Sequence, residues 1–131
     1  MDAILVVDDE QSVCELLYSI LSRRHWVATA RDAEEAISML GKAHYDVMIS
    51  DLRMKGADGL ELIGEASARW PHLRTVLLSG YVEDNVARRA HALGVSAVVE
   101  KPFDAIEFQA QVEGILADAR AAAELPEAAA G

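Results

Sequence analysis

The chain has 131 residues, of which 52% are hydrophobic and only 5% aromatic, and its net charge is −10. This length suits one domain with an aliphatic core. The acidic balance argues against direct nucleic-acid binding, which needs a concentrated positive surface. A single cysteine, Cys14, fits a reducing compartment, and no apolar run reaches the roughly 20 residues of a membrane span. We therefore expect a cytoplasmic protein that does not enter the membrane.

Five short apolar segments alternate with helical patterns along the chain. Most of these segments are apolar on consecutive residues, which is typical of strands covered on both faces. The predicted strands are residues 3–7, 26–30, 46–50, 75–79 and 96–100, and the predicted helices are residues 11–24, 32–40, 58–70, 83–94 and 104–119. The alternation predicts an α/β, doubly wound, flavodoxin-like (βα)5 fold with a parallel five-stranded sheet and right-handed crossovers.

Local signals mark several helix ends. Asp32 and Asp104 are each followed by a glutamate three residues later, which resembles a capping box. Gly94 is placed to terminate the fourth helix. Residues 1–118 are predicted to form the domain. Residues 119–131, rich in Ala, Glu and Pro, are predicted to be the end of the last helix and a disordered tail.

Polar side chains stand where four of the strands end. Asp8 and Asp9 follow the first strand, and Asp51 follows the third. In the strand order 2-1-3-4-5 these two strands are neighbours at the switch point, where such sheets bind ligands. Ser79 and Lys101 end the fourth and fifth strands. Helix capping does not explain five such groups at one edge of the sheet.

This set of side chains suggests a chemistry. Clustered carboxylates stay ionised only beside a cation, and a site of oxygen ligands suits Mg²⁺. A carboxylate beside Mg²⁺ can attack phosphorus and form an acyl phosphate. Lys101 could neutralise phosphoryl oxygens, and the Ser79 hydroxyl could donate a hydrogen bond to one of them. The strand-end acids are therefore predicted to hold a metal for phosphoryl transfer.

Four motifs in this order, "VVDDE", "ISDLRMKGADGLEL", "LLSGY" and "EKPF", resemble the signatures of the receiver domain of bacterial two-component response regulators. The resemblance extends from residue 3 to about residue 118 and is closest to stand-alone, CheY-like receivers. It implies that Asp51 is the phospho-acceptor and that Asp9 binds Mg²⁺ directly. Asp8 would bind through water, and the backbone carbonyl of Arg53 would complete the protein ligands.

The resemblance also implies a phosphorelay role. A sensor histidine kinase or a phosphotransfer protein would phosphorylate Asp51, and the chain would catalyse only its own phosphorylation and dephosphorylation. Ser79 would follow the phosphoryl group and move the loop after the fourth strand. Lys101 would pair with phosphoryl oxygens, and its peptide bond to Pro102 would be cis. A downstream protein, or a second copy of the chain, would dock on the face formed by residues 83–94, 96–100 and 104–119.

The sequence departs from the family pattern at two positions. Lys55 stands where proline is usual, which is expected to loosen the loop after the phospho-acceptor. Val98 stands where the family has its switch aromatic, so a rotating aromatic side chain is not expected to report the state of the site. Tyr81, two residues after Ser79, is predicted to assume part of that role.

Two other functions are compatible with parts of the pattern. Phosphatases of the haloacid dehalogenase type also use Asp, Ser or Thr, Lys and Mg²⁺. Their first-strand acids are two residues apart, whereas Asp8 and Asp9 are adjacent, and this chain lacks room for a substrate cap. The other alternative is a phosphorylation-independent interaction module, against which the retention of all five site residues argues.

Several residues are interpreted as structural. The four histidines, His25, His44, His72 and His91, have no metal-ligand spacing and are predicted to lie at the surface. Cys14 is predicted to be a small core residue. Gly56 and Gly59 are predicted to serve the turn into the third helix without contacting a ligand. Trp70, before Pro71, is predicted to end that helix with a packed indole.

Overall fold

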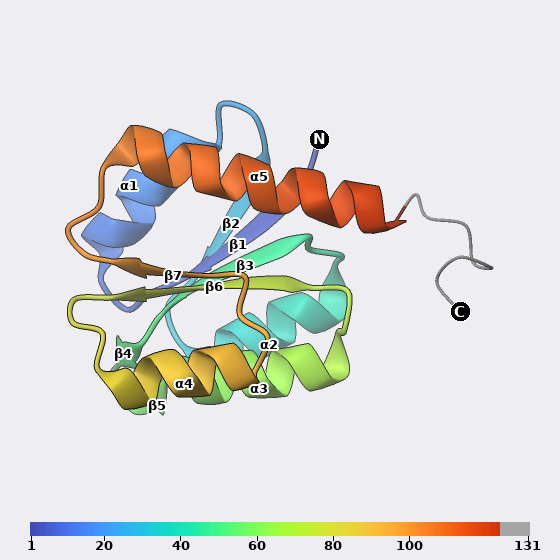
Figure 1. The fold of residues 1–131 in the computed structure, drawn as a ribbon. Helices are drawn as coiled ribbons and strands as arrows, with labels where there is room; N and C mark the ends of the chain where they lie inside the picture. The colour runs from blue at the N-terminus through green and yellow to red at the C-terminus, as the bar shows by residue number, and fades with distance from the viewer. Residues whose placement is uncertain (124–131) are drawn as a thin grey trace.

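The computed structural model describes residues 1–123, and its helices and strands alternate along the chain (Figure 1). The elements are β1 (Ala3–Val7), α1 (Gln11–Leu21), β2 (Trp26–Ala30), α2 (Ala33–Lys42), β3 (Val47–Asp51), β4 (Arg53–Met54), β5 (Ala57–Asp58), α3 (Gly59–Arg69), β6 (Arg74–Ser79), α4 (Asp84–Ala92), β7 (Ala97–Glu100) and α5 (Ala105–Ala123).

The main sheet has five strands in the order β2-β1-β3-β6-β7, and every neighbouring pair is parallel. Because β6 and β7 are the fourth and fifth predicted strands, this order confirms the prediction 2-1-3-4-5. The sequence did not predict β4 and β5, which form a separate antiparallel pair of two-residue strands. Elements this short have no detectable hydrophobic period.

Helices cover both faces of the sheet, with α1 and α5 on one face and α2, α3 and α4 on the other (Figure 1). The side chains of β1 show how the two cores are built. Leu5 and Val7 belong to one hydrophobic cluster, whereas Ile4 and Val6 belong to the other. This alternation follows from the two-residue period of a strand. It explains why the strand is apolar at consecutive positions.

The predicted capping signals are confirmed. The Asp32 side chain accepts a 2.7 Å hydrogen bond from the Glu35 backbone N–H, and Asp104 Oδ1 accepts one of 2.9 Å from that of Glu107. Gly94, with φ of +74°, follows α4 in the left-handed conformation that favours glycine. The last helix, α5, continues to Ala123. The disordered tail predicted after it falls on residues 124–131, outside the described residues.

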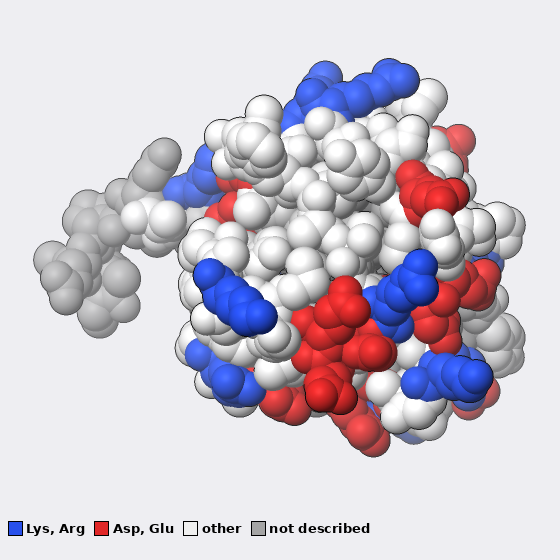
Figure 2. Space-filling model, turned by 180° about the vertical axis from the view of Figure 1, so that it is seen from behind, with Lys and Arg blue, Asp and Glu red and all other residues white. Residues whose placement is uncertain are grey.

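Charged side chains are interspersed on the face shown in Figure 2. Acidic side chains form a patch near the centre of this face, others lie separately toward its right edge, and the basic side chains do not merge into a continuous surface (Figure 2). In residues 1–123 the structure contains no helix with the length and apolar character that a membrane crossing requires.

Candidate phosphoryl-accepting site

Three charged side chains meet at the carboxyl ends of the parallel strands. Asp8 follows β1, Asp51 ends β3, and Lys101 follows β7. Lys101 Nζ lies 2.6 Å from Asp51 Oδ1 and 3.6 Å from Asp8 Oδ2. These three side chains come together as the strand-order argument predicted, because parallel strands end at a common edge.

Asp8 is the most deeply buried of the charged groups, with 1% of its surface exposed. Its Oδ1 accepts a 2.9 Å hydrogen bond from the Glu10 backbone N–H. Its Oδ2 is buried without a hydrogen-bond partner among the described residues. Burial raises the pKa of Asp8, and the negative charge of Asp51 adds to this rise. Asp8 therefore carries a charge that the surrounding protein compensates only in part.

Lys101 supplies the positive charge of the site. Burial alone would lower the pKa of Lys101, but its hydrogen bond to Asp51 and the charges of Asp51 and Asp8 raise it above the ordinary value. The side chain therefore remains an ammonium group at neutral pH, and it points at the carboxylate of Asp51.

Asp9 is exposed and turns toward the two-stranded hairpin formed by β4 and β5. Its Oδ2 accepts a 2.8 Å hydrogen bond from the backbone N–H of Lys55, which lies at the tip of this β4–β5 hairpin. Arg53 begins the same hairpin, and its exposed guanidinium lies 4.0 Å from Glu83. The segment that follows Asp51 is thus linked to Asp9 through Lys55 and to Glu83 through Arg53.

A cavity of about 410 Å³ opens beside Asp51. Its lining includes Lys101 and Ser79 together with Glu10, Leu52, Arg53, Gly80 and Tyr81. The buried Ser79 hydroxyl donates a 2.7 Å hydrogen bond to the Tyr81 carbonyl oxygen, and the Tyr81 side chain is 70% exposed. Ser79 therefore shares the cavity with Asp51 while its hydroxyl is bonded to the adjacent loop.

The remaining predicted positions lie around this cavity. Val98 is half-buried in β7 and packs against the hydrophobic core. The peptide bond between Lys101 and Pro102 is cis, as predicted.

The oxygen-rich donor set fits Mg²⁺. The carboxylates of Asp8, Asp9 and Asp51 and the backbone carbonyl of Arg53 are hard oxygen donors, which this ion prefers. The buried Oδ2 of Asp8, which has no hydrogen bond among the described residues, is the kind of atom that a cation or its bound water would satisfy. Within residues 1–123 the structure contains no group of three or more His, Cys, Asp or Glu side chains arranged so that they could hold a metal ion by themselves.

Two residues of the site had no predicted role there. Glu10 lines the cavity, and its place directly after Asp9 was the available signal. Gly59 begins α3, and a Cβ at this position would lie 2.1 Å from the Asp51 carbonyl oxygen. Only a residue without a side chain fits so close to the backbone at the end of β3. The sequence indicated a turn at Gly59 but not this contact.

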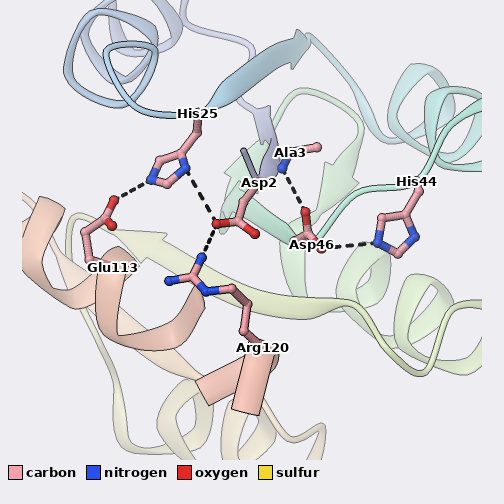
Figure 3. Close-up of polar contacts among 7 residues, drawn as sticks. All are labelled: Asp2, Ala3, His25, His44, Asp46, Glu113 and Arg120. Atoms are coloured by element: carbon pink, nitrogen blue, oxygen red, sulfur yellow. Dashed lines mark hydrogen bonds and ion pairs between the residues drawn. The ribbon is translucent and has the colours of Figure 1, made fainter. Parts of the chain in front are cut away.

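The surface prediction is wrong for one of the four histidines. His25 is 7% exposed, whereas His44, His72 and His91 are exposed as predicted. The His25 ring lies between two acidic side chains, with Nε2 bonded to Glu113 and Nδ1 3.8 Å from Asp2 (Figure 3). Burial is possible because these carboxylates, distant in sequence, partner the imidazole. The predictions for Cys14 and Trp70 are confirmed, since Cys14 is buried and Trp70 caps α3 while packing against the core.

The chain has a parallel (βα)5 sheet in which a lysine contacts two aspartates at the switch point. This combination is typical of a class of phosphoryl-accepting signalling domains. The family model of the response regulator receiver domain matches residues 4–113, and the chain belongs to this family. The match covers most of the described fold and all five strand-end residues.

Known proteins support the same assignment. The response regulator protein FleR of Pseudomonas aeruginosa is 32% identical over 78% of this chain, and the transcriptional regulatory protein ZraR of Salmonella typhimurium is 32% identical over 97%. The chain spans only 22% and 29% of those two proteins, respectively. It therefore corresponds to about a quarter of each relative.

Solved structures show the same fold. The response regulator protein TrrA of Thermotoga maritima, determined in complex with Mg²⁺ and BeF, is 32% identical, with a TM-score of 0.79 over 88% of this chain and 99% of that one. A signal receiver domain from Pseudomonas fluorescens has a TM-score of 0.89 over 95% of this chain and 93% of that one, at 24% identity.

Proposed function

We propose that this receiver domain accepts a phosphoryl group on Asp51 from a histidine kinase or phosphotransfer protein and thereby changes its binding to a downstream partner. The observation that carries the proposal is the 2.6 Å contact between Lys101 Nζ and Asp51 Oδ1, beside a buried Asp8 Oδ2 that has no hydrogen bond among the described residues. This arrangement holds the Asp51 carboxylate beside a cavity, in contact with the positively charged ammonium group of Lys101.

The reaction is an exchange of one bond to phosphorus for another. An Asp51 carboxylate oxygen attacks phosphorus as the bond from phosphorus to the donor's imidazole nitrogen breaks, and the products are an acyl phosphate and a free histidine. Hydrolysis of the acyl phosphate returns Asp51 and inorganic phosphate.

Lys101 and Ser79 have separate roles in this step. Lys101 donates a hydrogen bond to the Asp51 carboxylate and then pairs with a phosphoryl oxygen. Ser79 gives up its hydrogen bond to the Tyr81 carbonyl and donates to another phosphoryl oxygen. Mg²⁺, held by Asp8, Asp9, Asp51 and the Arg53 carbonyl, would neutralise charge on the transferring group.

The change at Ser79 suggests where partners bind. The loop that begins at Gly80 leads directly into α4, and α4 is followed along the chain by the edge strand β7 and by α5. We assign the phosphorylation-sensitive surface to α4, β7 and α5, for either a downstream protein or a second copy of the chain. Tyr81 is the large exposed side chain on the moving loop.

Phosphodonor labelling tests the proposal. Acetyl phosphate with Mg²⁺ should add one labile phosphoryl group, detected by intact mass, and EDTA should prevent the addition. Asp51→Asn should abolish labelling, because the amide oxygen is a poor nucleophile. A phosphoryl group mapped to Asp8 or Asp9 in the wild type would overturn the assignment. Sustained turnover of a generic phosphate ester would indicate a phosphatase instead.

A further inference from the structure

The backbone N–H of Lys55 contacts a predicted metal ligand. Asp9 Oδ2 accepts this hydrogen bond at 2.8 Å, across 46 positions of sequence. The Asp9 carboxylate lies next to Asp8 and Glu10, so its neighbours along the chain repel it. A carboxylate offers about four lone-pair sites, so one hydrogen bond to Oδ2 leaves positions free for a cation.

The turn that presents this N–H has a defined geometry. Met54 pairs with Ala57, so Lys55 and Gly56 form a two-residue loop. Gly56 has φ of +75°, and no other described residue of this loop has positive φ. This sign pattern is that of a type II turn, in which the second residue tolerates proline. The loop can therefore lose the Lys55 N–H without losing its shape.

We infer that the backbone N–H of Lys55 is a positioning group that orients Asp9 for Mg²⁺ binding. The inference rests on the proposed function, because it assumes that Asp9 is a metal ligand. Ligating carboxylates are commonly fixed by hydrogen bonds to their other oxygen, and losing such a partner typically costs 10- to 100-fold in metal affinity. Proline, which has no N–H, could not supply this hydrogen bond.

Two substitutions at one position separate the backbone from the side chain. Lys55→Pro removes the N–H and the ammonium group, whereas Lys55→Ala removes only the ammonium group. Each variant is titrated with MgCl₂ alone, without a phosphodonor, and the amide signals of Asp51 and Leu52 are followed by NMR. Lys55→Pro should bind Mg²⁺ at least about tenfold more weakly than Lys55→Ala. Thermal unfolding of both variants in EDTA checks that the fold is unchanged.

Equal affinities in the two variants, or tighter binding by Lys55→Pro, would overturn the inference, because the hydrogen bond would then be neutral or in competition with the metal. A wild-type measurement covers the case in which Lys55→Pro does not fold. The Lys55 amide proton should stay hydrogen-bonded, and slow to exchange, when the wild type is saturated with Mg²⁺; its release would contradict the inference. If the wild type binds no Mg²⁺ at all, both the inference and the metal-dependent part of the proposed function fail.

Discussion

Asp8 is a buried acid whose charge is only partly compensated. Lys101 lies 3.6 Å from it, but burial and the charge of Asp51 still raise the pKa of Asp8. An acid with a raised pKa in the folded state destabilises the fold when it is ionised. The destabilisation is complete above the raised pKa, and it disappears at pH values below the pKa of the unfolded chain. The ionised carboxylate of Asp8 therefore lowers the stability of the metal-free fold.

The substitution Asp8→Asn should therefore stabilise the metal-free protein at neutral pH, because it removes the buried charge. Urea unfolding in EDTA would measure this difference. The advantage of the variant should shrink as the pH falls through the raised pKa of Asp8, because protonation then removes the same charge from the wild type. Added Mg²⁺ should stabilise the wild type more than the variant. A destabilised variant would show that attraction to Lys101 outweighs burial.

Gly59 provides a second test at a single residue. A methyl group at this position would lie 2.1 Å from the Asp51 carbonyl oxygen, so Gly59→Ala should destabilise the fold by about 2 kcal/mol or more. Gly114→Ala in α5 is the matched control, because a Cβ there meets nothing within 4 Å. It should stabilise the helix by up to about 1 kcal/mol. Thermal unfolding of both variants would show opposite signs, and equal effects would contradict this account.

At the scale of elements, α5 is tied to the start of the chain by a cluster of charged groups. Glu113 and Arg120 project from α5 toward His25 and Asp2, respectively (Figure 3). His25 is buried in this contact, whereas the other three histidines among the described residues are exposed. The cluster anchors the second half of α5 on the side of the sheet where α1 also lies.

The substitution Glu113→Ala should destabilise the protein by about 1 to 3 kcal/mol, because it leaves the buried His25 ring without its closest partner. Asp118→Ala is the control, since it removes an exposed carboxylate from the same helix. Its effect should stay within about 0.5 kcal/mol. Chemical unfolding would compare the two variants. Equal stabilities would show that the His25 contact contributes nothing to the anchoring of α5.

The elements differ in how far the sequence could predict them. The five main strands and their flanking helices follow from runs such as residues 3–7, because apolar continuity and helix caps are local signals. The hairpin formed by β4 and β5 is too short for such a signal. Its hydrogen bond to Asp9 depends on a backbone N–H, which no side-chain pattern reveals. The burial of His25 likewise depends on partners such as Glu113, 88 positions away.

At the scale of the whole molecule, two ion pairs connect α4 and its N-cap residue to the hairpin that follows Asp51. Arg89 in α4 lies 3.3 Å from Asp58, and Glu83 lies 4.0 Å from Arg53. Asp58 also caps α3, so its position is fixed from both sides. A shift of the loop before α4 would therefore change contacts that begin two residues after Asp51.

The last prediction concerns how this loop responds to the site. Ser79 cannot donate to a phosphoryl oxygen while its hydroxyl is bonded to the Tyr81 carbonyl, so occupation of the site should release the loop. Val98 is too short to report this change by moving between buried and exposed positions. Tyr81, now 70% exposed, should instead change its environment.

Beryllofluoride with Mg²⁺ provides a stable phosphoryl mimic for this experiment. The mimic can shift the equilibrium between the free and the phosphorylated-like conformation only if it binds the second more tightly. Contacts with Ser79 and Lys101 would supply this difference in affinity. NMR should show large shifts over residues 82–93 and an altered Tyr81 ring. Ser79→Ala, which retains Asp51 and Lys101, should bind the mimic with much smaller shifts in α4. Wild-type shifts confined to the acidic pocket, with Tyr81 unchanged, would contradict the loop mechanism. That result would favour a domain that drains phosphoryl groups from a shared kinase without switching a partner surface.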